Sequence, residues 1–181
     1  AIAKAAVKRL QPGQMVFVDA GTTTAILAEE LSLIGRLVVV TNSITVALKL
    51  AGTQATAGTA NALRVVLLGG DTNPEIPCTF GEVTLNEIRR YRADVTLLSP
   101  VGISAQDGIT FGNEHEASLA TAMAEQSSSM LVLADYSKIG LRSRYAVACP
   151  PANQTLITNA HPSNTEALAA LSAQGVAVIP V

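Results

Sequence analysis

The segment best suited to binding chemistry is Asp19-Ala-Gly-Thr-Thr-Thr24, which follows an apolar run. Gly21 permits a sharp turn of the backbone, and Thr22, Thr23 and Thr24 place hydroxyl and free N–H groups at the start of a predicted helix. Such a helix start stabilises an anion such as phosphate. Because an ordinary threonine N-cap uses the same N–H groups, this segment alone leaves both interpretations open.

Polar or glycine-containing segments also follow four further apolar runs that are typical of strands. In an open parallel sheet, ligands bind beyond the carboxyl ends of the strands, so we expect these segments to meet at one edge. Their glycines, hydroxyls, amide, carboxylates and lysine suit a hydroxylated, phosphorylated small molecule. We predict that the residues that bind it are Asp19, Gly21, Thr22, Thr23 and Thr24 of the first segment, together with Thr41, Asn42, Gly69, Gly70, Gly102, Glu116, Asp135 and Lys138.

Two of these charged side chains allow more than one interpretation. Lys138 could neutralise a phosphate or carboxylate of the ligand, or it could be a solvated lysine paired with Asp135, which contributes little to stability. Glu116, on the first turn of a helix that starts at Asn113, could contact a sugar hydroxyl or complete a capping box. His115 beside it is expected to be an exposed helix residue.

Common signatures of catalysis and cofactor binding are missing from the sequence. It has no Ser/His/Asp, HExxH or CxxC pattern, and no Gly-x-Gly-x-x-Gly follows the first predicted strand. The last absence argues against dinucleotides. We therefore predict no catalytic residues, no metal and no cofactor.

The elements that must position these residues follow from the hydrophobic pattern. Strands are predicted at residues 15–18, 37–40, 64–68, 94–98, 130–134, 145–148, 155–157 and 176–179. Helices alternate with them, including one after Gly81 with Val83, Leu85 and Ile88 facing inward, and residues 52–61 are expected to be a loop. Most strands are apolar runs without two-residue alternation. This pattern predicts an α/β fold with a mostly parallel, doubly wound sheet.

Composition restricts the classes of function. With 181 residues and 49% hydrophobic residues, the chain is expected to form one domain. A net charge of −2 and 12 Lys and Arg residues argue against nucleic-acid binding by this chain itself. No apolar run approaches the roughly 20 residues of a membrane span. Two separated cysteines and the absence of a signal peptide predict a cytoplasmic protein, and a start at Ala1 favours a fragment of a longer one.

A set of short motifs resembles the effector-sensing domain of the DeoR family in order and spacing, from Ile2 to about Asn159. The motifs are Asp19-x-Gly-Thr-Thr23, Thr41-Asn-Ser43, Leu68-Gly-Gly70, Phe80-Gly81, Val101-Gly-Ile103, Asn113-x-x-Glu-Ala117 and Asp135-x-Ser-Lys138-x-Gly140. Two positions depart from the family pattern. Asn159 stands where the family often has Asp, and Tyr136 stands where a smaller residue is frequent.

The resemblance implies a fold and a function. The family consists of bacterial transcription regulators, usually repressors of sugar or nucleoside catabolism and usually homo-oligomers. A winged helix-turn-helix domain, expected to be absent from this chain, binds the operator, and the sensing domain binds a phosphorylated sugar or related metabolite. That domain resembles ribose-5-phosphate isomerase, glucosamine-6-phosphate deaminase and CoA transferases in fold.

Two alternatives to a sensor stay open at this point. A sugar-phosphate isomerase or deaminase would use Glu116, Asp135 or Asp19 as the base and Lys138 as an electrostatic partner. A module for interaction only would leave the predicted edge empty. We favour the sensor because the motif set is that of the regulators.

Overall fold

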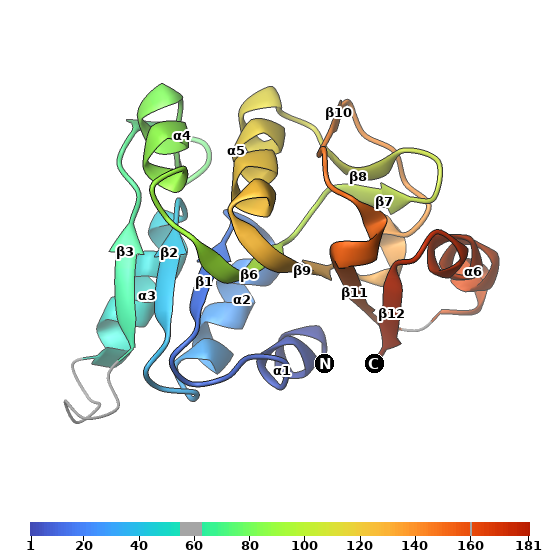
Figure 1. The fold of residues 1–181 in the computed structure, drawn as a ribbon, viewed down its shortest axis with the longest axis horizontal. Coiled ribbons are helices and arrows are strands. Elements are labelled where there is room, and N and C mark those ends of the chain that lie inside the picture. Colours follow the sequence, from blue (N-terminus) through green and yellow to red (C-terminus); the bar gives the residue numbers. More distant parts are fainter. Residues whose placement is uncertain (55–62, 160) are drawn as a thin grey trace.

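The computed structural model describes residues 1–54, 63–159 and 161–181. Its central element is a sheet of seven strands, in which every neighbouring pair runs parallel (Figure 1). In chain order these strands are β1 (Met15–Val18), β2 (Val38–Thr41), β3 (Arg64–Leu67), β6 (Ala93–Leu98), β9 (Ser127–Leu133), β11 (Gln154–Thr158) and β12 (Ala177–Pro180). The sheet confirms the predicted fold class.

The strand order has one point at which the chain changes direction across the sheet. The order is β12-β11-β9-β6-β1-β2-β3, so the chain runs outward from β1 to one edge and from β6 to the other. Because the connections after β1 and β6 lead to opposite sides, a crevice opens between the carboxyl ends of these two strands. The segments after Val18 and Leu98 border this crevice.

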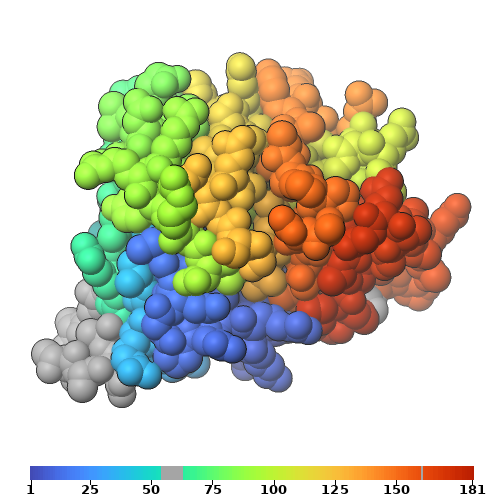
Figure 2. All heavy atoms as spheres, viewed as in Figure 1, coloured from blue at the N-terminus to red at the C-terminus, as the bar shows by residue number. Residues whose placement is uncertain are grey.

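Helices cover both faces of the sheet, which explains why its central strands are mostly apolar. Val16 and Val18 pack with α1 (Ile2–Val7), α2 (Thr22–Leu31) and α3 (Ile44–Gln54) on one face. Phe17 packs with α4 (Glu82–Ile88) and α5 (Glu114–Glu125) on the other, and α6 (Thr165–Ala173) covers the far end of that face. Figure 2 shows α4, α5 and the segment after β9 side by side across this second face.

Two small antiparallel sheets were not predicted. One contains β7 (Gly102–Ser104), β8 (Gly108–Phe111) and β10 (Tyr145–Ala146), and the other contains β4 (Asp71–Thr72) and β5 (Thr79–Phe80). Only β10 coincides with a predicted strand. The others are two to four residues long, too short to carry a readable alternation.

Two local predictions were wrong. Val83 does not face inward, since it is 59% exposed, and the buried neighbour is Thr84, whose hydroxyl donates to the carbonyl oxygen of Gly69 at 2.6 Å. The predicted loop at 52–61 begins too early, because α3 continues to Gln54. Residues 55–61 of that loop lie outside the described residues.

Candidate functional site

A cavity of about 530 Å³ lies beyond the carboxyl ends of β1 and β6, at the crevice that the strand order creates. Pockets of this size are typical of small-molecule sites. Four of the predicted binding residues line it: Gly21, Thr22, Glu116 and Lys138. They come from the β1–α2 turn, the first turn of α5 and the 3₁₀ helix η2 (Tyr136–Lys138).

Two further predicted residues, Asp19 and Asn42, lie around a much smaller cavity of about 10 Å³. Ala20, Phe111 and Glu116 line both cavities, so the small one adjoins the large one. It has room for about one water-sized group.

The remaining predicted residues do not line either cavity, and their contact with a ligand stays a prediction. Thr41 is buried, and its hydroxyl donates to the carbonyl oxygen of Val18 at 2.6 Å and accepts from the amide of Ser43 at 3.0 Å. Gly102 lies inside β7, against the backbone of Leu141. The others outside the cavity walls are Thr23, Thr24, Gly69, Gly70 and Asp135.

The start of α2 provides both an N-cap and free amides. The hydroxyl of Thr24 accepts a hydrogen bond from the amide of Gly21 at 2.9 Å and is buried beneath the turn. No described residue accepts a hydrogen bond from the amides of Thr22 and Thr23. The turn itself requires glycine, because a Cβ on Gly21 would lie 2.7 Å from the Cβ of Ser99. Thr24 therefore satisfies the amide of the N-cap residue Gly21, and the amides of Thr22 and Thr23 stay available for an anion.

Lys138 is not paired with Asp135, although the two are close in sequence. Its Nζ lies 3.4 Å from the hydroxyl oxygen of Ser99, and among the described residues no carboxylate forms an ion pair with it. Asp135 instead accepts hydrogen bonds from the hydroxyl and the amide of Ser137, which hold its pKa below the usual range. The solvated Asp135–Lys138 pair that the sequence left open is thus not formed.

The turn that carries Lys138 is held from the side of β11 and α6. The amide of Tyr136 donates to Oδ1 of Asn159 at 2.9 Å, and Nδ2 of Asn164 donates to the carbonyl oxygen of Tyr136 at 2.9 Å. The ring of Tyr136 stacks on His161 with centroids 4.7 Å apart. The two departures from the family pattern, Tyr136 and Asn159, therefore meet in one hydrogen bond.

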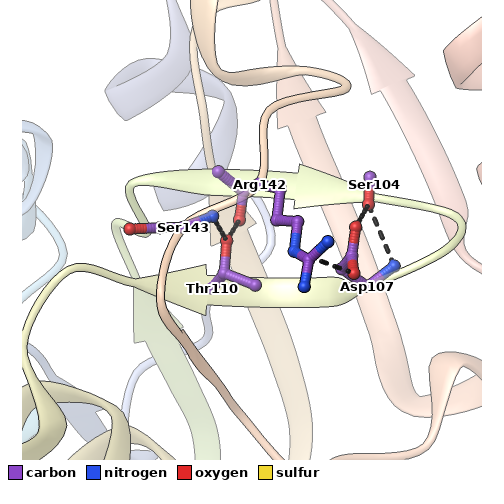
Figure 3. Close-up of polar contacts among 6 residues, drawn as sticks. Ser104, Asp107, Thr110, Arg142 and Ser143 are labelled. Carbon is purple, nitrogen blue, oxygen red and sulfur yellow. Dashed lines mark hydrogen bonds and ion pairs between the residues drawn. The ribbon is translucent and has the colours of Figure 1, made fainter.

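The chain after Lys138 is fixed to the β7–β8 hairpin (Figure 3). The guanidinium of Arg142 lies 3.4 Å from the carboxylate of Asp107, and the amide of Ser143 donates to the hydroxyl of Thr110 at 2.9 Å. Asp107 also accepts from the hydroxyl of Ser104 at 3.2 Å. With both ends held, η2 presents Lys138 to the cavity from a fixed turn.

Asp19 is a buried carboxylate with only half of its hydrogen-bonding capacity used. It is 6% exposed, its Oδ2 accepts from the amide of Ser99 at 2.8 Å, and its Oδ1 has no partner. Burial, with a smaller contribution from the nearby charge of Glu116, raises the pKa of Asp19 to about 7 against the lowering effects of Ser99, Thr24 and Lys138.

Glu116 faces the cavity and does not complete a capping box. The side chain of Asn113 caps α5 by accepting from the amide of His115 at 2.8 Å, whereas no described residue hydrogen-bonds to the carboxylate of Glu116. Partial burial raises the pKa of Glu116. Its carboxylate is therefore free to accept hydrogen bonds from a ligand.

Several cavity residues were missed by the sequence analysis. Ser99 directly follows β6, and its position at a strand end was a usable signal. Ile76 and Pro77 belong to the segment between β4 and β5, and Phe111 ends β8, so they depend on pairings that the sequence did not predict. Pro100 and Val101 belong to a segment that we expected at this edge, although we did not predict them as binding residues. The other missed residues are Ala20, Ala25, Ser43, Thr45 and Glu75.

Two kinds of feature were not found in the described part of the chain. Within it, no group of three or more His, Cys, Asp or Glu side chains could hold a metal ion. None of its helices is long and apolar enough to cross a membrane.

Solved structures with a similar fold include enzymes and translation factors. Ribose-5-phosphate isomerase A from Methanocaldococcus jannaschii aligns with a TM-score of 0.53 and 16% identity, covering 76% of this chain and 51% of the isomerase. The β subunit of eIF2B from Chaetomium thermophilum aligns with a TM-score of 0.53 and 14% identity, covering 79% and 39%. At this identity the likeness shows the α/β fold alone.

Sequence relatives are named as regulators of transcription. The chain is 33% identical to the HTH-type transcriptional regulator GlpR of Haloferax volcanii, over 79% of this chain and 53% of the relative. It is 30% identical to the HTH-type repressor GlcR of Bacillus subtilis, over 90% and 59%. The glycerol-3-phosphate regulon repressor of Escherichia coli is 29% identical, over 77% and 52%. The chain thus spans about half the length of these relatives, and their names agree with the prediction of a transcription regulator.

The comparison with family models identifies the same class of regulator as the relatives do, and its match includes the cavity. A model described as the DeoR C-terminal sensor domain matches residues 1–160, which include β1 to β11 and every residue of the cavity wall. The chain belongs to the DeoR family of transcriptional regulators and contains its C-terminal sensor domain.

Proposed function

We propose that this chain is an effector-sensing domain that binds a phosphorylated sugar in the cavity beyond β1 and β6. The observation that carries the proposal is the position of Lys138. Its ammonium group forms no ion pair with a described carboxylate, and it shares the cavity with the start of α2, where the amides of Thr22 and Thr23 lack acceptors. A cation and free amides in one cavity favour a phosphate group.

The other groups of the cavity suit the sugar part of such a ligand. Glu116 and Ser99 provide a carboxylate and a hydroxyl, and Ile76, Pro77 and Phe111 provide apolar surface for carbon atoms. The name of the Escherichia coli relative, a glycerol-3-phosphate regulon repressor, supports a phosphorylated polyol or sugar as the chemical class.

The regulatory consequence extends beyond this chain. We propose that residues 1–181 form one sensing domain, and that a helix-turn-helix segment of the whole protein binds the operator, as the names of the relatives imply for them. The ligand would then control transcription by its different affinity for two states of a homo-oligomer. Such a protein acts in the cytoplasm, where phosphorylated sugars and operators meet.

A thermal-shift screen against sugar monophosphates tests the binding step. A ligand present at 100 times its Kd stabilises the folded state by roughly 2.7 kcal/mol, which gives a clear shift in Tm. The Lys138→Met variant should lose roughly 10- to 150-fold in affinity, because a charge-assisted hydrogen bond contributes about 1.5–3 kcal/mol. Its unfolding free energy should change by less than about 1 kcal/mol, since Lys138 forms no ion pair with a described residue.

Lys8→Met is the matched control, because Lys8 is exposed and lies away from the cavity. It should leave both affinity and stability unchanged. Absence of a shift with every sugar monophosphate, or full affinity in Lys138→Met, would contradict the proposal.

A further inference from the structure

We infer that Asp19, Asn42 and Glu116 form an acceptor subsite at the inner end of the cavity, which takes the hydroxyl-bearing end of the ligand and rejects ligands that carry a second anionic group. The inference rests on the proposed function, since it assumes that the phosphate occupies the anion end, by which we mean the part of the cavity lined by Thr22 and Lys138. It adds the orientation of the ligand and its permitted charge.

The first observation is a pair of buried oxygen atoms without partners. Oδ1 of Asp19 and Oδ1 of Asn42 accept no hydrogen bond, although the two residues are only 6% and 4% exposed. Buried polar atoms in folded proteins are almost always hydrogen-bonded, so each exception needs an explanation. Both residues line the same cavity of about 10 Å³, so a donor group of a ligand placed there would lie next to both side chains.

The orientation of the Asn42 amide is fixed by its surroundings. Its Nδ2 donates to the carbonyl oxygen of Thr79 at 3.0 Å, and the amide of Thr79 donates to the carbonyl oxygen of Asn42 at 2.8 Å. Rotating the amide by half a turn would place its oxygen against the carbonyl oxygen of Thr79. The oxygen of Asn42 is therefore the atom that stays unsatisfied at the small cavity.

Asp19 is held in a similar way, since its Oδ2 receives the amide of Ser99 at 2.8 Å and only Oδ1 remains unpaired. Glu116 completes the subsite, because its carboxylate lines both the small and the large cavity and receives no hydrogen bond from a described residue. Three side chains at this end therefore present acceptor oxygens that no described residue uses. Hydroxyl groups of a sugar, or the ammonium group of an amino sugar, are the donors that fit them.

Charge decides which ligands are excluded. Lys138 is the one cationic side chain among the described residues that line the large cavity, and Glu75 and Glu116 are both anionic. A phosphate at the anion end would use that cation. A second phosphate or a carboxylate at the acceptor subsite would face Asp19 and Glu116, and the described residues of the cavity wall offer no second cation to balance it. Like charges at close range oppose binding.

Matched pairs of compounds that differ by one anionic group test the inference by calorimetry. The pairs are glucose 6-phosphate with 6-phosphogluconate, fructose 6-phosphate with fructose 1,6-bisphosphate, and glycerol 3-phosphate with 3-phosphoglycerate. At pH 8, where Asp19 is mainly ionised, the monophosphate of any pair that binds should bind at least about tenfold more tightly than its more anionic partner.

Two variants should reduce this discrimination. Asp19→Asn and Glu116→Gln each remove a negative charge and add an amide donor, so the ratio of affinities within a pair should fall several-fold towards one. Asp94→Asn is the matched control, since the carboxylate of Asp94 accepts the amide of Met15 at 2.8 Å at the start of β6, away from the cavity. That variant should keep the wild-type ratio.

The outcomes separate the two proposals. If more anionic compounds bind as tightly as the monophosphates, or if neither cavity variant changes the ratio, the acceptor subsite is wrong while phosphate binding stands. If no phosphorylated compound of either kind binds, the proposed function fails and the inference fails with it. Because Glu116 is only half-buried, Glu116→Gln keeps the test valid if Asp19→Asn does not fold.

Discussion

The buried carboxylate of Asp19 should make the stability of this protein depend on pH, and the substitution Asp19→Asn should remove that dependence. Asp19→Asn keeps a side-chain oxygen for the amide of Ser99, which donates to Oδ2 at 2.8 Å, and it removes the buried charge. We expect the variant to gain stability relative to the wild type as the pH rises from 5 to 8.

The direction and size follow from the pKa of Asp19 in the two states. An aspartate in the unfolded chain titrates near 3.8, and burial raises the pKa of Asp19 in the folded protein to about 7. Between these values the folded state holds a proton that the unfolded state has lost. Wild-type stability therefore falls with rising pH by roughly 1.4 kcal/mol per unit, and becomes constant above about pH 7.

Between pH 5 and pH 8, stability falls only over the roughly two pH units below the folded-state pKa of about 7. The wild type should therefore lose about 2–3 kcal/mol of unfolding free energy from this group. Asparagine does not titrate, and the variant lacks this loss. The difference in unfolding free energy between Asp19→Asn and the wild type should accordingly grow by about 2–3 kcal/mol over this range.

Urea unfolding at pH 5, 6, 7 and 8 measures the difference. Groups such as Glu116, whose pKa burial also raises, are present in both proteins and largely cancel in the comparison. Asp94→Asn serves as the control, because Asp94 accepts a backbone amide at 2.8 Å as Asp19 does but is exposed. Its difference from the wild type should vary by less than about 0.5 kcal/mol.

A difference between Asp19→Asn and the wild type that stays constant with pH would refute the reasoning. It would mean that Asp19 titrates at an ordinary pKa, and that Ser99 and Lys138 stabilise its charge as well as water does. A difference that grows towards low pH would mean a lowered pKa, the opposite of what burial without a partner should produce.

Two further predictions concern the backbone conformation at Gly70 and DNA binding by this chain. Gly70→Ala should destabilise the fold by about 2 kcal/mol or more in urea unfolding, because Gly70 has φ +142° and a Cβ there would lie 2.6 Å from the carbonyl oxygen of Phe80. The sugar-phosphate affinity of the folded variant should be unchanged, and a selective loss of affinity would put Gly70 in the site. The chain by itself should not bind duplex DNA specifically at physiological salt, because its net charge is −2, and sequence-specific binding in fluorescence anisotropy would overturn this.

The main sheet was predictable because its central strands are buried on both faces. Apolar runs at β1, β2, β6 and β9 differ clearly from the loops that follow them, and parallel strands align their carboxyl ends. This rule brought Asp19, Gly21 and Lys138 to one edge, where the structure has them around adjoining cavities.

The same rule did not resolve position along that edge. Neighbouring strands are about 4.8 Å apart, so Gly69 and Gly70, which follow β3 two strands away from β1, lie roughly 10 Å from the crevice. Gly102 is the first residue of the short strand β7, so it belongs to a strand and not to the loop that follows one. The outer walls depend on pairings such as Tyr145 with Phe111, which join short segments far apart in sequence and leave no local signal.

The turn that carries Lys138 shows how a departure from a family pattern can preserve geometry and change charge. Oδ1 of Asn159 accepts the amide of Tyr136 at 2.9 Å, and an aspartate oxygen could accept the same bond. An aspartate would also add a negative charge next to η2, whereas asparagine adds none. Asn164 holds the other side of Tyr136 with a neutral amide, and Asp135 directs its oxygen to Ser137. Neutral hydrogen bonds thus fix much of the turn, and the charge of Lys138 remains available to a ligand in the cavity.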